Sequence, residues 1–130
     1  MSVLSHIIFY VKDIPEAVSF YKNAFGIEPK FIHESQMYAE LDTGETTLAF
    51  AAEMLGKENL PDGYIPLGLD RLPQAGEIVF IQADVQAAYE QAIQAGAIAL
   101  VPPKGKPWGQ TVAYVRDPNG VLIEIASPMK

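Results

Sequence analysis

The sequence contains no cysteine. This absence excludes a disulfide framework, a thiolate metal site and a cysteine nucleophile in one step. Any chemistry of this chain must therefore use oxygen atoms and imidazole nitrogens, and only two histidines are present to supply the latter.

Basic residues and long apolar runs are also scarce. Nine Lys and Arg residues stand against sixteen Asp and Glu residues, which gives a net charge of −7. Such a surface repels a phosphate backbone or an anionic bilayer, so we expect neither nucleic acid nor a membrane as a partner. No segment approaches the roughly 18 apolar residues that a membrane span needs, and the first residues do not resemble a secretory signal. We expect a cytoplasmic protein whose residues 1–130 form a single domain.

Two segments of the chain resemble each other. Residues 6–24, HIIFYVKDIPEAVSFYKNA, align without a gap on residues 77–95, EIVFIQADVQAAYEQAIQA. Each segment reads as an apolar strand that ends at Asp, followed by apolar residues at helical spacing. Asp13 and Asp84 are suited to cap the two helices, and Gly26 and Gly96 are suited to end them.

Three short strand-like runs follow each predicted helix. They are residues 28–33, 36–42 and 46–51 in the first half, and residues 97–101, 110–115 and 121–126 in the second. Tight-turn sequences, DTGE and DPNG, join the last two strands of each half, which favours antiparallel ribbons over a parallel βαβ fold. The chain thus divides into repeat one (about 5–54), a linker (55–76) and repeat two (about 77–127). The linker shows no clear periodicity, and loops of this length are often functional lids.

The opening HIIFYVKDIPEAVSFYKNAFG resembles that of the vicinal oxygen chelate superfamily, which includes glyoxalases, bleomycin-resistance proteins and extradiol dioxygenases. The run RDPNGVLIEIASP resembles the closing hairpin of that superfamily, in which a strand with a ligand Glu follows the turn. The resemblance implies an α+β fold: two βαβββ repeats forming a cupped, partly open eight-stranded mixed sheet with helices on the convex outside. It also implies a homodimer, often with sites shared between chains. The superfamily hosts enzymes and non-catalytic drug binders alike, so this fold does not fix the function.

The resemblance places the superfamily's four ligand positions at His6, Ala49, Glu77 and Glu124. Strand alternation puts all four on the concave face. His6, Glu77 and Glu124 can bind a divalent metal ion, whereas Ala49 cannot. The superfamily more often has a second His at position 77, and this departure puts iron oxygenase chemistry in doubt. Two carboxylates and one imidazole suit Mn²⁺, Fe²⁺ or Mg²⁺, with Ni²⁺ and Zn²⁺ also open.

A physical argument supports a metal ion at Glu124. This residue lies in the run VLIEIA, and an ionised carboxylate that is buried without a partner is costly. A cation would neutralise Glu124 and Glu77 together. The alternative is that Glu124 pairs with His6 while Glu77 is solvated at the start of its strand. His33 is a lone residue after a strand, which is more typical of a rim residue than of a ligand.

Aromatic and polar residues near these positions are candidates for binding a substrate. The candidates are Tyr10, Tyr38, Ala49, Trp108 and Gln110. The loop PPKGKPWGQ, residues 102–110, contains the only Trp of the chain. We expect this loop either to close over a ligand or to form a packed surface turn.

The sequence leaves two main hypotheses for function. The first is a metal-dependent enzyme, of the lyase/isomerase or dioxygenase type, acting on a small oxygenated substrate that chelates the ion. Glu77 and Glu124 would then be catalytic residues that move a proton. The alternative is a metal-free drug- or metabolite-binding protein of the bleomycin-resistance type, which Ala49 and Glu77 favour. An interaction domain without a small-molecule ligand is the third, weaker hypothesis.

Overall fold

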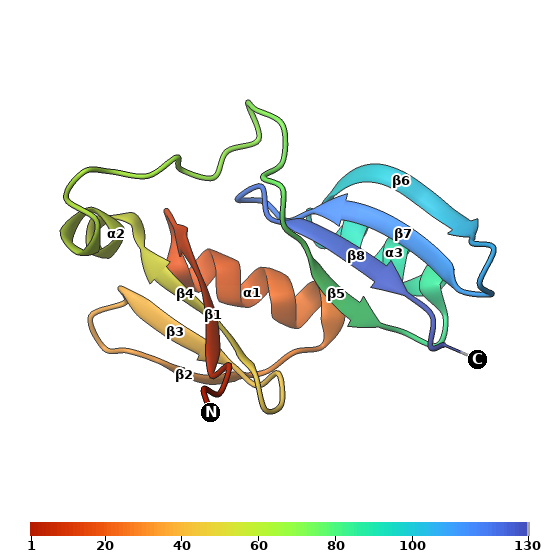
Figure 1. The fold of residues 1–130 in the computed structure, drawn as a ribbon, viewed down its shortest axis with the longest axis horizontal. Helices are drawn as coiled ribbons and strands as arrows, with labels where there is room; N and C mark the ends of the chain where they lie inside the picture. The colour runs from red at the N-terminus through yellow and green to blue at the C-terminus, as the bar shows by residue number, and fades with distance from the viewer. Residues whose placement is uncertain (130) are drawn as a thin grey trace. The chain divides into compact units, whose positions relative to one another are not determined.

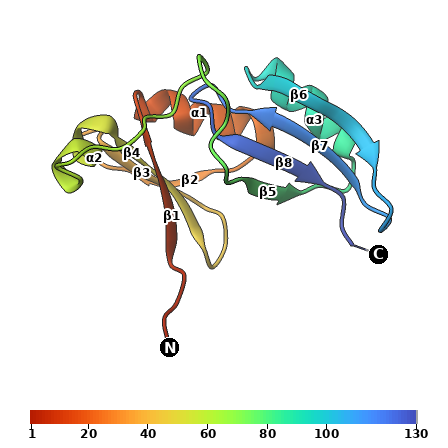
Figure 2. The same ribbon diagram turned by 45° about the horizontal axis from the view of Figure 1, so that its top comes forward.

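The structure is a computed structural model that describes residues 1–129. The chain forms two compact units, shown in Figures 1 and 2. The first unit comprises residues 1–22 and 26–66, and the second comprises residues 23–25 together with the chain from Leu67 on. Each unit has its own sheet and its own buried core, and each is described separately below.

The first unit contains four strands and two helices. They are β1 (His6–Val11), α1 (Ile14–Phe25), β2 (Pro29–Ile32), β3 (Tyr38–Leu41), β4 (Thr47–Ala52) and α2 (Glu53–Asn59), with the last turn of α1 counted in the second unit. The strand order is β1-β4-β3-β2, with β1 parallel to β4 and the other pairs antiparallel. The central strand β4 therefore separates β1 from β3.

The second unit repeats this arrangement. Its elements are β5 (Ile78–Ile81), α3 (Val85–Gln94), β6 (Ile98–Gly105), β7 (Thr111–Arg116) and β8 (Leu122–Ala126). The strand order is β5-β8-β7-β6, again with one parallel pair, β5 and β8. The α+β class and the two βαβββ units are confirmed, and the eight strands fall into two hydrogen-bonded sheets of four.

The predicted helix caps are present. The Asp13 carboxylate accepts the backbone N–H of Glu16 at 3.0 Å, and the Asp84 carboxylate accepts that of Ala87 at 3.0 Å. Each bond satisfies one of the N–H groups that a helix start leaves without a partner. At the other end of α1, Gly26 takes a φ of 69°, a left-handed conformation that glycine adopts without steric cost.

In each unit one face of the sheet forms the core. In the first unit, the Tyr21 ring of α1 packs on Phe50 of β4 with ring centroids 5.2 Å apart, and both side chains are fully buried. In the second unit, Ile123 and Ile125 of β8 are fully buried, and α3 lies along the sheet of β6, β7 and β8 (Figure 1). Because side chains alternate along a strand, Glu124 lies on the opposite face of its sheet.

The segment predicted as a linker begins inside a helix. Residues 53–59 form α2, which contacts β1 and β4. Gly56 lies directly beneath the rings of Tyr64 and Tyr10, where a Cβ atom would come within 2.8 and 2.9 Å of ring atoms. The helix is only seven residues long, too short for a sequence periodicity to show. Among the described residues, no helix has the length and apolar character to span a membrane.

The DPNG turn of the second unit is supported from two sides. The buried Asp117 carboxylate accepts the backbone N–H groups of Asn119, Gly120 and Val121 at 2.8, 2.8 and 2.9 Å. The buried Arg116 guanidinium donates to the carbonyl oxygens of Gly120, Arg71 and Gly68. Arg116 therefore ties the end of the linker to the β7–β8 turn.

Candidate functional site

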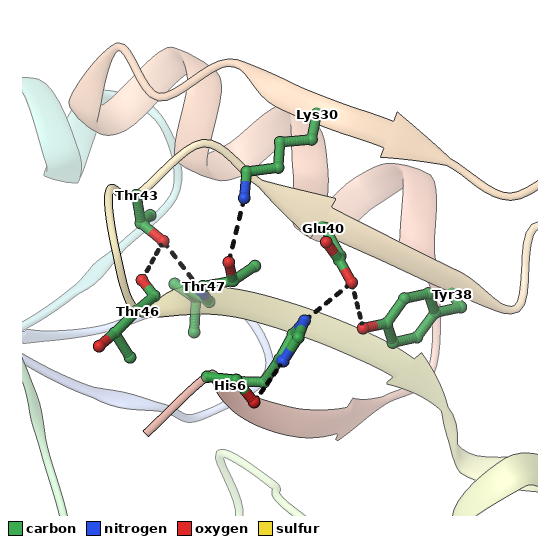
Figure 3. Close-up of polar contacts among 9 residues, drawn as sticks. His6, Lys30, Tyr38, Glu40, Thr43, Thr46 and Thr47 are labelled. Carbon is green, nitrogen blue, oxygen red and sulfur yellow. Dashed lines mark hydrogen bonds and ion pairs between the residues drawn. The ribbon is translucent and has the colours of Figure 1, made fainter. Parts of the chain in front are cut away.

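A polar cluster lies on the sheet of the first unit, on the face opposite Phe50. It consists of His6 on β1 and of Tyr38 and Glu40 on β3, and we call it the first-unit cluster (Figure 3). The Nε2 atom of His6 lies 3.0 Å from Oε2 of Glu40, and the Tyr38 hydroxyl donates to the same oxygen at 2.8 Å. The two acid–base side chains are partly accessible, with 36% of His6 and 18% of Glu40 exposed. A small ligand can therefore reach this cluster.

The neighbours of Glu40 favour its charged form. The hydrogen bond from Tyr38 is the largest influence that lowers the pKa of Glu40, and His6 and Lys30 lower it further. Burial and the adjacent Glu40 raise the pKa of Tyr38 to about 12. At neutral pH the cluster therefore contains an ionised carboxylate and a neutral phenol that donates to it.

The second unit has a corresponding cluster of two acids and a tyrosine. The Tyr114 hydroxyl of β7 donates to Oε1 of Glu124 on β8 at 3.0 Å. Glu77, just before β5, lies close enough to Glu124 for that residue to affect its pKa. Partial burial raises the pKa of Glu77, and the neighbouring Glu124 raises it further. We call Glu77 and Glu124 the acid pair.

The structure places the three predicted metal ligands in different units. His6 lies in the first unit and is bonded to Glu40, whereas Glu77 and Glu124 lie together in the second unit. The acidic partner that we considered for His6 was Glu124, and the partner in the structure is Glu40.

Sequence reasoning missed Glu40 because it considered only the first and last strands of each half. A signal was present in the sequence. Residues 36–42 were expected to form a strand, and alternation along it puts Tyr38 and Glu40 on one face. What was not readable was that this face lies within reach of His6, because that depends on the order of the strands.

Two candidate substrate-binding residues are covered within the first unit. Ala49 is fully buried and pairs in register with Ile8 on one side and Glu40 on the other. The Tyr10 ring packs on the Tyr64 ring with centroids 5.1 Å apart, and its hydroxyl accepts a hydrogen bond from Asn59. The linker therefore contacts Tyr10 directly.

The loop predicted at residues 102–110 begins inside a strand. β6 continues to Gly105, and a tight turn closes the hairpin where the N–H of Gly109 donates to the carbonyl of Lys106 at 3.0 Å. The Trp108 indole N–H donates to Gln110 at 2.7 Å, and Gln110 donates to the carbonyl of Ser127 at 2.8 Å. Trp108 stays 57% exposed, so it presents a fixed aromatic surface at the tip of the hairpin.

The sequence model of the Glyoxalase/Bleomycin resistance protein/Dioxygenase superfamily matches residues 3–125 of this chain. The chain belongs to this superfamily. A relative from Bacillus subtilis (strain 168), the uncharacterized protein YraH, is 30% identical over 129 residues, which cover 94% of this chain and 95% of YraH. Members of the superfamily typically bind small molecules, and many use divalent metal ions.

Solved structures of glyoxalase-family proteins share the fold of this chain. A glyoxalase-related enzyme from Fulvimarina pelagi has a TM-score of 0.85 at 21% identity, covering 98% of this chain and 89% of that one. A glyoxalase/bleomycin resistance protein/dioxygenase family enzyme from Burkholderia phytofirmans PsJN has a TM-score of 0.78 at 23% identity, covering 97% of this chain and 98% of that one. At these identities the likeness establishes the fold and leaves the reaction open.

Because many members of the superfamily use divalent metal ions, we ask whether the acids and imidazoles of this chain could hold one. Among residues 1–129, no three His, Asp or Glu side chains are grouped so that they could hold a metal ion. The acid pair brings two carboxylates together within the second unit, one short of the three side chains that such a group needs.

Proposed function

We propose that this chain is a metal-dependent enzyme of the superfamily, of the lyase/isomerase or dioxygenase type, that acts on a small oxygenated substrate chelating a divalent cation. The observation that supports this most is the acid pair. Two carboxyl groups lie close enough on one sheet face for Glu124 to raise the pKa of Glu77, and a divalent cation could neutralise the negative charge they carry when both are ionised.

The residue types of the three predicted ligands are ones that bind such ions. Glu77 and Glu124 would supply carboxylate oxygens, and His6 stays the predicted third ligand. Only the neighbouring Ser5 hydroxyl, at 2.9 Å, bonds Nδ1 of His6 among the described residues, so this nitrogen is open to exchange. When bound, the ion would supply a Lewis acid that stabilises negative charge on a substrate oxygen.

The acid pair also has a role of its own. Glu124 is held by the Tyr114 hydroxyl, whereas the raised pKa of Glu77 keeps a proton available closer to neutral pH. A carboxyl group in that state is suited to give or accept a proton at the substrate. We therefore assign proton transfer to Glu77 and Glu124. Glu124 is held in place by Tyr114, and Glu77 is the more readily protonated of the two.

Thermal unfolding with added metal ions tests this proposal. We expect Mn²⁺, Ni²⁺ or Zn²⁺ to raise the Tm of chelator-treated protein, because an ion at 100 times its Kd stabilises the folded state by about 2.7 kcal/mol. Glu124→Gln should abolish the rise. The matched control is Glu90→Gln on α3, where Glu90 bonds only Gln86 at 3.0 Å among the described residues. A rise that persists in Glu124→Gln, or no rise in the unmodified protein, contradicts the proposal.

A second candidate is a metal-free binding protein for a drug or metabolite. The bond between His6 and Glu40 favours it, since that bond engages a nitrogen of the predicted metal ligand, and so does Ala49, which offers no ligand atom. Aromatic drugs should then bind with the same affinity with and without EDTA in isothermal titration calorimetry. A loss of binding on chelation favours the enzyme.

Three further expectations from the sequence stay predictions. They are a homodimer, a cytoplasmic location, and substrate contacts from Tyr10, Tyr38, Ala49, Trp108 and Gln110. Light scattering after size-exclusion chromatography measures the first directly.

A further inference from the structure

Strand β2 contains a β-bulge, in which one residue has no counterpart on the neighbouring strand. Pro29 lies opposite Leu41 in the antiparallel pair β2–β3. Phe31 lies opposite Glu40, which is the residue next to Leu41, so Lys30 is the extra residue. A bulge interrupts the alternation of side chains along a strand and redirects one of them. Without it, Lys30 and Phe31 would point to opposite faces of the sheet.

The bulge brings Lys30 and Phe31 to the same face. Nζ of Lys30 donates to Oγ1 of Thr47 at 3.1 Å, and Figure 3 shows Lys30 reaching from β2 to Thr47 on β4. The Phe31 ring lies next to the Tyr38 ring, with centroids 6.0 Å apart. Thr47 is in register with His6, so both side chains of this bulge lie on the face of the first-unit cluster.

Thr47 is a buried polar residue that still has a hydrogen to donate. It is only 5% exposed, and its hydroxyl oxygen accepts the bond from Lys30. Across residues 1–129, this hydroxyl group makes no other bond, and Lys30 forms no ion pair. An ammonium group carries three N–H donors and a hydroxyl group carries one. Donors of both residues therefore lie side by side with no acceptor from the described part of the chain.

We propose that Lys30 and Thr47 form an anchor for the carboxylate group of a small apolar or aromatic organic acid. A carboxylate accepts hydrogen bonds at both of its oxygens, and two donor atoms 3.1 Å apart suit it. Phe31 is 44% exposed beside Lys30, so its ring offers an apolar surface for the rest of the ligand.

The charges on this face favour a monoanion. One ammonium group offsets one negative charge, and the ionised Glu40 carboxylate lies on the same face as Thr47. A phosphate dianion therefore meets stronger repulsion from Glu40 than a carboxylate does. The anchor lies entirely within the first unit and needs no metal ion, so it goes beyond the proposed function.

The first experiment follows ligand binding by two-dimensional ¹H–¹⁵N NMR, with EDTA in every sample. Benzoate is the probe, benzamide is its uncharged counterpart with the same ring, acetate lacks the ring, and inorganic phosphate tests the other anion. We expect benzoate to bind most tightly and benzamide at least about 10-fold more weakly, because hydrogen bonds between charged groups are the stronger ones. The proposal is overturned if benzoate causes no saturable shift, or if benzamide or phosphate binds as tightly as benzoate.

The second experiment repeats the benzoate titration on variants. Lys30→Gln should weaken binding at least about 10-fold, and Thr47→Val, which removes only the hydroxyl group, about 3–10-fold. Thr47→Ser keeps the hydroxyl group and should bind like the unmodified protein. The control is Lys57→Gln, which removes an exposed lysine from α2 in the same unit and should change nothing. Unchanged affinity in Lys30→Gln overturns the anchor, and unchanged affinity in Thr47→Val overturns the role of Thr47.

The same spectra locate the ligand. We expect benzoate to move the backbone N–H resonances of Lys30, Phe31 and Thr47 and to leave those of the second unit in place. Shifts confined to the second unit overturn the assignment. Because EDTA is present throughout, failure of this anchor leaves the proposed metal-dependent function standing, and failure of metal ions to raise the Tm leaves the anchor standing.

Discussion

At the scale of single residues, each unit pairs one glutamate with one tyrosine. Tyr38 donates to Glu40 on the same strand, whereas Tyr114 of β7 donates to Glu124 across the ladder on β8. In the antiparallel pair β3–β4, Glu40 lies opposite Ala49, and in the pair β7–β8, Tyr114 lies opposite Glu124. Both units therefore contain a Tyr–Glu hydrogen bond. The acid comes from the third strand, β3, in the first unit and from the last strand, β8, in the second.

The acid pair predicts a pH dependence of stability in metal-free protein. The folded-state pKa of Glu77 is raised above its ordinary value of 4.5, so the protonated form is favoured by folding. Its contribution to the free energy of unfolding is fully present below that ordinary value and is lost as the pH rises through the raised pKa. Glu77→Gln keeps an uncharged donor at every pH. We therefore expect this variant to gain stability relative to the unmodified protein as the pH rises from about 4.5 through the raised pKa of Glu77.

Urea denaturation at a series of pH values measures this difference. Glu90→Gln is again the control, and its stability relative to the unmodified protein should stay nearly constant over the same range. A stability difference for Glu77→Gln that shrinks as the pH rises contradicts the raised pKa of Glu77.

At the scale of elements, α2 packs closely against its neighbours at one glycine, Gly56. The Tyr64 hydroxyl donates to the carbonyl of Glu53 at 3.2 Å, and the Tyr64 ring covers Gly56 and packs on Tyr10. The loop after α2 is therefore folded back over the helix and against β1. This places the linker within reach of any ligand that contacts Tyr10.

Gly56→Ala should destabilise the protein by about 1–3 kcal/mol, the usual cost of overpacking. In an open helix the same change stabilises by up to about 1 kcal/mol, so the sign of the effect is diagnostic. The added Cβ would meet ring atoms of Tyr64 at 2.8 Å and Tyr10 at 2.9 Å. Gly76→Ala is the control, because a Cβ there meets no described atom within 4 Å. Chemical denaturation measures both, and a stabilised Gly56→Ala would refute the packing.

At the scale of the whole molecule, two compact units share one chain that the sequence predicts to be a single domain. Each unit has fully buried apolar residues of its own, such as Leu41 in the first and Ile123 in the second. Trp108 is the only tryptophan and belongs to the second unit. Its fluorescence therefore reports on the second unit alone, whereas circular dichroism reports on both.

Leu41→Ala tests whether the units unfold together. Truncation of a buried Leu typically costs about 2–5 kcal/mol. In a single cooperative domain, this change in the first unit should shift the Trp108 transition and the circular dichroism transition by the same amount. Ile123→Ala, in the second unit, is the comparison and should do the same. A Trp108 transition that stays in place in Leu41→Ala while circular dichroism changes would show that the units are separate domains.

The sequence alone determined the elements of this fold other than α2, and the chemistry available to it. The caps at Asp13 and Asp84 and the turn at Asp117 were readable because each depends on hydrogen bonds between residues within a few positions of each other. Strand alternation likewise identified Glu124 as a polar residue between two core residues. The absence of cysteine limited the candidate ligands to His, Asp and Glu.

Only the tertiary structure decided which of these groups meet. His6 and Glu40 are far apart in sequence, and they touch because β4 inserts between β1 and β3 and leaves only small side chains beneath their contact. The helix α2 was hidden for a related reason, since its packing on β1 and β4, and not a periodic sequence, defines it. Strand order and packing are set by free energies summed over many distant contacts, and no local pattern of residues encodes that sum.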